Sequence, residues 1–121
     1  MKLKLRQIWA SQQAMPKLLN KELANPKASY WIGKNARALD VEFDALNEKR
    51  IALVKRLGVE DKKLKKWDIP EPKREEFNHL FEQLLDTEVE VNVMPINLDM
   101  ISDAKLTPID MVAIEFMLKE A

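Results

Sequence analysis

The chain has 121 residues, of which 46% are hydrophobic and 33% charged. This length and composition exclude a disordered chain and predict one soluble folded domain over residues 1–121. No apolar run approaches the roughly 20 residues that cross a bilayer, and the alternating N-terminus is unlike a secretory signal, so we expect a cytoplasmic product. The sequence contains no cysteine, which excludes disulfides and thiolate chemistry.

The formal net charge is zero, but the charges are unevenly distributed. Residues 1–39 carry eight Lys or Arg and one acid, whereas residues 68–121 carry four basic and thirteen acidic residues. Such an asymmetry fits a basic arm for nucleic acid, head-to-tail self-association, or two ends that meet inside one fold. We favour the last, because residues 2–6 alternate Lys with Leu and residues 88–93 alternate Glu with Val. The two strands that these patterns predict have complementary faces, so we expect them to pair as a two-stranded ribbon of undetermined direction.

Three helices are predicted before the second strand. Residues 7–24 form a helix that Pro16 kinks or divides into two short helices. Residues 26–57 form a long helix that begins at the Asn25-Pro26 cap and ends at Gly58, for which we expect a left-handed conformation. Residues 59–70 form a charged connection, with Leu64 and Trp67 pinned to the helices. A third helix over residues 72–87 then lies back along the long helix as an antiparallel hairpin.

The long helix carries a seven-residue apolar repeat of coiled-coil character, made by Ile32, Ala36, Leu39, Phe43, Leu46, Leu53 and Leu57. Arg50 occupies the polar slot of this repeat, either at the edge of the stripe or facing a carboxylate such as Glu82 or Asp86. A helix of about 48 Å exceeds the diameter of so short a chain, so it protrudes or associates with a partner.

The C-terminal region is predicted to be an irregular stretch or a single turn over residues 96–106, followed by an apolar helix. Thr107 is its N-cap and Pro108 stands in its first turn. Eight of the ten residues from Ile109 to Leu118 are apolar, so this helix is either a central core element or has one side in an interface. The interface hypothesis comprises Ile109, Val112, Ala113, Phe116 and Met117, together with Leu39, Phe43 and Leu46 of the long helix.

Candidate chemistry is sparse. Glu76 and His79 have the spacing of a di-iron bundle motif, but His79 is the only histidine and the chain holds only two glycines. We therefore predict neither catalysis nor a metal or cofactor. The alternative to protein binding is nucleic-acid binding, through phosphate contacts and base stacking by basic and aromatic residues. The residues for this alternative are Lys62, Lys63, Lys65, Lys66 and Trp67 in the connection, and Lys34 and Arg37 on the long helix.

Several segments spread along the chain carry a family resemblance: Lys2-Leu3-Lys4-Leu5, Ala38-Leu39, Glu42-Phe43, Asn47-Glu48-Lys49-Arg50, Glu88-Val89-Glu90-Val91, Leu106-Thr107-Pro108 and Asp110-Met111. Together they resemble a family of small proteins encoded in tailed bacteriophages and prophages, a domain of unknown function. The resemblance implies a phage setting and assigns no catalytic or binding residue. In such a setting we expect a non-enzymatic virion or assembly protein, located in the host cytoplasm during assembly or in the virion, that contacts itself or other phage structural proteins. The alternative is a small regulator that binds nucleic acid or inhibits a host protein.

In fold class we expect an α+β protein that is mostly helical, with a long helical hairpin, a small two-stranded ribbon and an apolar C-terminal helix.

Overall fold

The computed structural model describes residues 1–119, and 63% of the chain is helical. The expected α+β class with a long helix and small two-stranded sheets is confirmed. The helices are α1 (Leu5–Ser11), α2 (Met15–Leu19), α3 (Pro26–Leu57), α4 (Glu71–Leu85) and α5 (Pro108–Ala113), with 3₁₀ turns η1 (Leu98–Ala104) and η2 (Glu115–Met117). The strands are β1 (Lys2–Lys4), β2 (Val59–Asp61), β3 (Lys66–Asp68), β4 (Glu88–Glu90), β5 (Ile96–Asn97) and β6 (Leu118–Lys119). They form three separate pairs, β1 with β4, β2 with β3, and β5 with β6.

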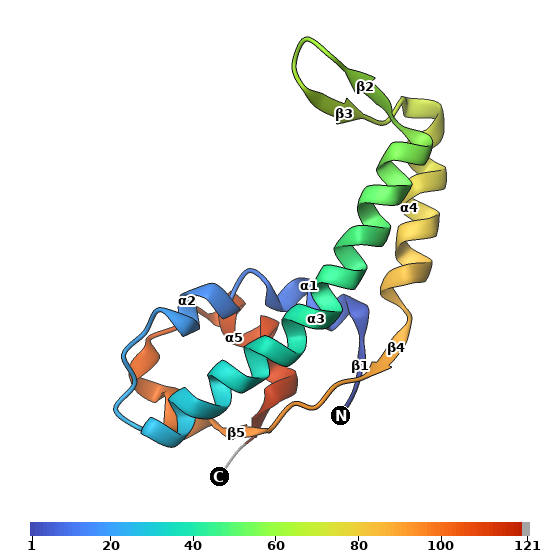
Figure 1. Ribbon diagram of the computed structural model, residues 1–121. Helices are drawn as coiled ribbons and strands as arrows, with labels where there is room; N and C mark the ends of the chain where they lie inside the picture. Colours follow the sequence, from blue (N-terminus) through green and yellow to red (C-terminus); the bar gives the residue numbers. More distant parts are fainter. Residues whose placement is uncertain (120–121) are drawn as a thin grey trace.

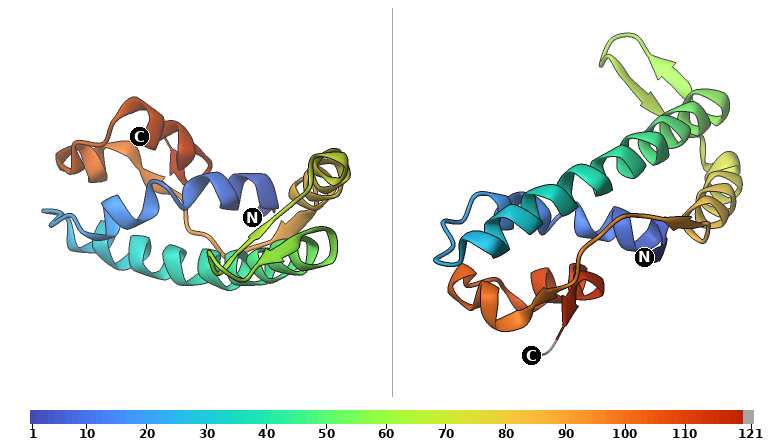
Figure 2. Two further views of the ribbon diagram at one scale, coloured as in Figure 1. Left: turned by 90° about the horizontal axis from the view of Figure 1, so that it is seen from above. Right: turned by 60° about the horizontal axis from the view of Figure 1, so that its bottom comes forward.

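The long helix α3 connects two parts of unequal thickness (Figure 1). Its first half belongs to a layered body, in which α1 and α2 lie between α3 and the C-terminal segments (Figure 2). Its second half projects from the body with α4 alongside it and the β2–β3 hairpin at the far end. We call residues 47–84 the arm. Leu57 is the only buried residue of the arm, so the arm has almost no core of its own.

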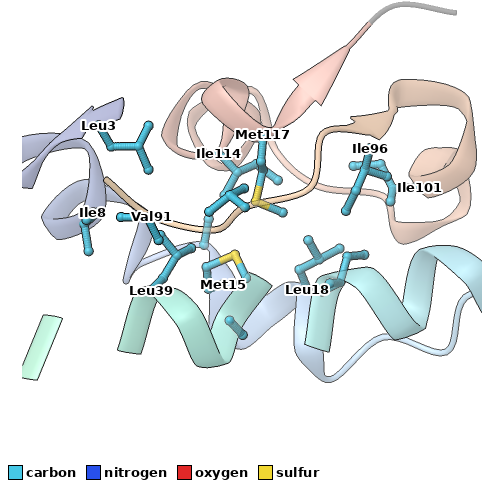
Figure 3. Close-up of a cluster of buried hydrophobic side chains, with 14 of the residues drawn as sticks. Leu3, Ile8, Met15, Leu18, Leu39, Val91, Ile96, Ile101, Ile114 and Met117 are labelled. Atoms are coloured by element: carbon cyan, nitrogen blue, oxygen red, sulfur yellow. The ribbon is translucent and has the colours of Figure 1, made fainter. Parts of the chain in front are cut away.

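The core lies in the body. Apolar side chains from α1, α2 and the first half of α3 face those from the C-terminal segments (Figure 3). The fully buried members include Ile8, Leu18, Leu39, Ile114 and Met117. The body therefore holds most of the hydrophobic stabilisation of the chain, because this term scales with the apolar area removed from water.

The predicted ribbon is present and antiparallel, with Leu3 opposite Val89. The same register places Lys2 opposite Glu90 and Lys4 opposite Glu88, as the charge pattern predicts. Both strands are shorter than the predicted ranges 2–6 and 88–93, because α1 begins at Leu5 and regular pairing ends at Glu90.

Ion pairs join the basic first part of the chain to its acidic last part. The N-terminal ammonium contacts Glu90 at 2.7 Å, and Arg6 contacts both Glu82 and Asp86. The pairing with these two carboxylates raises the pKa of Arg6. The prediction that the two ends meet inside one fold is confirmed, although these exposed pairs each stabilise only weakly.

The boundaries of α3 are as predicted, but its end is formed differently. The Asn25 side chain caps the helix by accepting from the backbone N–H groups of Lys27 and Ala28. Gly58 is extended rather than left-handed, with φ −94° and ψ 171°. A Cβ atom at Gly58 would overlap the carbonyl oxygen of Val54 and lie 3.1 Å from that of Asp68. Glycine is required here by a close backbone approach rather than by a left-handed turn.

The first predicted helix is divided into α1 and α2, one of the two outcomes expected from Pro16. The break falls over residues 12–14, and Pro16 is the second residue of α2. A proline is tolerated there because the first N–H groups of a helix have no partner within it.

Two further expectations are wrong. The connection over residues 59–70 contains the β2–β3 hairpin, and Leu64 and Trp67 are 63% and 39% exposed instead of being pinned to the helices. The helix expected from Ile109 to Leu118 ends at Ala113, and the chain continues through η2 into β6, which pairs in parallel with β5. An almost wholly apolar run has no period that separates a helix from a buried irregular segment.

Aromatic rings mark the place where the arm joins the body. Trp9 stacks on Phe43 at 5.6 Å between centroids and meets Phe81 edge-on at 5.4 Å. Arg50 lies 5.8 Å from the Trp9 ring and donates to Asn47. The cluster connects α1, α3 and α4, and Arg50 does not face Glu82 or Asp86, which pair with Arg6 instead.

Candidate functional site: an apolar surface on α5

The most exposed large apolar side chains in the described part of the chain that share one helix face are on α5. Ile109 is 74% exposed and Val112 is 65% exposed. They are three residues apart, so they lie on the same face of the helix. Because larger exposed apolar patches mark sites of contact with other proteins, these adjoining side chains are the candidate centre of such a site.

A groove runs between α5 and η1, and of these two residues only Val112 lines it. One section has a volume of about 520 Å³, with Leu98, Ile101, Leu106 and Met111 among its walls. A second section of about 290 Å³ shares Leu98 and Met111 with the first and extends toward Leu118. We call this groove, together with Ile109 and Val112, the α5 patch.

The rim of the α5 patch carries both signs of charge. Asp99 and Lys105 line the first section of the groove, and Glu115 and Lys119 line the second. Within residues 1–119, none of these four side chains forms an ion pair. The patch therefore has an apolar centre and charged groups at its edge that are free to pair with a partner.

The position of α5 is fixed by its first turn. Thr107 accepts from the backbone N–H of Asp110, as its predicted role of N-cap requires. The Asp110 side chain is 5% exposed and pairs with Lys17 of α2 at 3.2 Å. Burial opposes ionisation of this carboxyl, but interactions with Thr107 and Lys17 outweigh it and lower the pKa of Asp110. This pair anchors α5 to α2, so that Ile109 and Val112 face outward.

The predicted interface residues divide into two groups. Leu39, Leu46 and Met117 are at most 1% exposed and belong to the core, so including them in a surface was wrong. Phe43, Ala113 and Phe116 are partly buried against that core. Ile109 and Val112 alone are well exposed. An apolar stripe in a sequence predicts which face of a helix is buried, but not whether the protein's own core or another molecule buries it.

The residues of the nucleic-acid alternative do not form one surface. Lys62, Lys63, Lys65, Lys66 and Trp67 lie on the β2–β3 hairpin at the end of the arm. Lys34 and Arg37 lie on the body half of α3, about 35 and 30 Å along the helix from its end. The Lys34 ammonium is 5.4 Å from the Tyr30 ring and 5.6 Å from the Trp31 ring, where it stabilises the helix locally.

Both residues of the Glu76–His79 motif are exposed on α4. Glu76 lies 3.9 Å from Arg56, and His79 is 3.3 Å from the amide of Gln83. No group of three or more metal-ligating side chains is found in residues 1–119.

Sequence reasoning missed Asn35. Its side chain is 1% exposed, donates to the carbonyl of Met94 and accepts from the N–H of the same residue, both at 2.9 Å. This pair holds the segment that leads from β4 to β5 against α3. The only sign in the sequence of a role for Asn35 is its place between Ile32 and Ala36 of the apolar repeat, and the repeat does not predict the hydrogen-bond partner of Asn35.

Comparisons of the chain with family models, with curated proteins and with solved structures found no match. None of the helices within residues 1–119 is both long enough and apolar enough to cross a membrane.

Proposed function

We propose that the protein is a non-enzymatic component of phage assembly or of the virion, and that it self-associates through the α5 patch. The observation that carries the proposal is the pair Ile109 and Val112, 74% and 65% exposed on one face of α5, with Val112 also lining an apolar groove. The family resemblance described above supplies the phage setting and no residue role. The setting and the self-association are tested separately.

The charges at the rim support a second copy of the chain as the partner. A two-fold interface brings the same patch of two subunits together, so the patch must be complementary to itself. An apolar centre ringed by two carboxylates and two ammonium groups meets this requirement, because the lysines of one copy can face the carboxylates of the other. A partner of strongly acidic or basic chemistry would match only half of this rim.

The test of self-association compares two double variants by sedimentation equilibrium. Ile109→Lys with Val112→Lys places two charges at the centre of the patch and should weaken association at least about a hundredfold, since each buried aliphatic side chain contributes about 1.5–3 kcal/mol. The matched control is Val41→Lys with Leu19→Lys, which adds the same charge at apolar positions that are 69% and 48% exposed elsewhere. A monomeric wild type, or equal effects of the two variants, would refute self-association through α5.

The setting is tested on the phage that encodes the protein. Quantitative mass spectrometry of purified virions and of assembly intermediates should find the chain in stoichiometric amount in one of them. Presence in virions identifies a virion part, and presence in intermediates alone identifies an assembly factor. Absence from both contradicts the proposal.

A further inference from the structure

The tip of the arm carries a dense positive charge. Four of the five residues from Lys62 to Lys66 are lysines, of which three lie in the turn that joins β2 to β3 and Lys66 begins β3. All five residues are exposed, and Trp67, the next residue along, is 39% exposed. The hairpin stands at the far end of the arm, away from the body, where a large ligand can reach it (Figure 1).

The acidic groups of the hairpin do not neutralise this charge by ion pairing. Asp61 accepts from the backbone N–H groups of Lys63 and Leu64 at 3.0 and 3.2 Å, and Asp68 lies 3.8 Å from Arg74. None of the four tip lysines takes part in an ion pair in the described part of the chain. Their charge is available to a partner.

The local backbone holds the tip in one shape. Three residue pairs form the antiparallel ladder, from Val59 opposite Asp68 to Asp61 opposite Lys66. Asp61 closes the turn, and Lys65 adopts the left-handed conformation with φ 51°. A turn with a defined shape loses less conformational entropy when its side chains bind a ligand.

We propose that this tip binds single-stranded nucleic acid, with the four lysines on successive phosphates and the Trp67 ring stacked on a base. Exposed rings beside cationic side chains are the usual means of binding a single strand without sequence preference. An anionic membrane also attracts lysines, but it is a poorer match, because stable membrane binding needs a second, apolar anchor and Leu64 is the only apolar side chain in the turn. This binding goes beyond the proposed self-association, which concerns the body at the other end of the molecule.

Fluorescence anisotropy with a labelled single-stranded oligonucleotide tests the proposal on the full chain, in salt from about 50 to 200 mM. The tip variant Lys62→Gln, Lys63→Gln and Lys66→Gln leaves the left-handed Lys65 in place. Its control, Lys21→Gln, Lys27→Gln and Lys49→Gln, removes the same charge from exposed positions elsewhere. The tip variant should bind at least tenfold more weakly at the lowest salt, and its plot of log affinity against log salt should be shallower by about 2, at about 0.7 per phosphate contact.

Trp67→Ala isolates stacking. It should weaken binding to the single strand at least about fivefold and change binding to a duplex of the same length much less. Absence of binding at low salt, or equal losses in the tip and control variants, would refute the proposal. Tip-dependent binding to phosphatidylserine vesicles without binding to the oligonucleotide would assign the tip to a membrane and equally overturn it. The double variant Ile109→Lys with Val112→Lys leaves the tip unchanged and should retain tip-dependent binding to the oligonucleotide, which separates this proposal from self-association.

Discussion

Asn35 shows how one buried polar side chain can organise a segment that has little regular structure. Residues 91–95, between β4 and β5, have no helix or strand of their own, and the two bonds from Asn35 satisfy both backbone groups of Met94. Replacing this amide removes the partner of a donor and of an acceptor at once, and each orphaned group costs about 1–3 kcal/mol when it cannot reach water.

We therefore expect Asn35→Leu to lower the free energy of unfolding by at least about 2 kcal/mol in urea denaturation. The matched control is Asn78→Leu on the exposed side of α4, which should change it by less than about 0.5 kcal/mol. Equal effects at the two positions would show that the bonds to Met94 do not hold the segment.

Asp110 makes the stability depend on acid. Because its pKa is lowered in the folded chain, the ionised carboxylate stabilises the fold at neutral pH. This stabilisation is fully present above the unfolded pKa of about 3.9 and is lost as the pH falls through the lower folded value. In Asp110→Asn the side chain at this position does not ionise, so its contribution to the free energy of unfolding does not change with pH.

The urea midpoint of the wild type should thus exceed that of Asp110→Asn at pH 7, and the gap should narrow as the pH falls below about 4. Glu90, whose pKa is lowered by the N-terminal ammonium, contributes to acid sensitivity in both proteins and cancels in the difference. If the difference in urea midpoint between the two proteins did not change with pH, the ion pair between Asp110 and Lys17 would not stabilise α5.

At the scale of elements, the two glycines predict opposite results for the same substitution. Both belong to α3 or its end, but a Cβ atom at Gly33 would meet nothing within 4 Å, whereas one at Gly58 would overlap the Val54 carbonyl. Gly33→Ala should stabilise the chain by about 0.5–1 kcal/mol, since alanine loses less backbone entropy within a helix.

Gly58→Ala should instead destabilise the last turn of α3 and the β2–β3 hairpin, by at least about 1 kcal/mol for their local opening. Amide hydrogen exchange of residues 54–68 measures that opening, and thermal unfolding measures the effect of the change at position 33. If the change at position 58 left exchange in these residues unaltered, the close approach to Val54 would have no energetic consequence.

Several elements could be predicted because their evidence is local. The Asn25-Pro26 cap and Gly58 delimit α3. The alternation of Lys with Leu and of Glu with Val identifies the β1–β4 pair, whereas its antiparallel direction and register come from the structure. The β5–β6 pair could not be predicted, since two residues per strand show no alternation. The end of α5 escaped prediction for a related reason, because Ile114 and Met117 are apolar whether they lie in a helix or in an irregular buried segment.

For the candidate sites, prediction was limited because the sequence does not show which tertiary contacts cover each side chain. The tip lysines could be named from composition, and the predicted extent of α3 already separates them from Lys34 and Arg37 by about 30–35 Å. The exposed pair on α5 and the buried Met117 belong to the same apolar run, and only the tertiary contacts tell them apart.

At the scale of the whole molecule, stability is unevenly distributed along α3. Five of its seven buried residues lie within residues 26–39, against the body, and only Leu46 and Leu57 lie beyond them. The arm that contains the rest of the helix has one buried residue, so little apolar area opposes its opening. A continuous helix in the structure can therefore consist of two units that open with different free energies.

Native-state hydrogen exchange should show this as a gradient within one helix. Amides of residues 32–43 should exchange only with global unfolding, whereas those of residues 48–57 and of α4 should exchange at least tenfold faster through local opening of the arm. Low concentrations of urea should leave the fast class unchanged and accelerate the slow class, because global unfolding exposes far more surface. Uniform protection along α3 would contradict the division of the molecule into body and arm, since it would require the arm to be as strongly held as the core that contains Leu39.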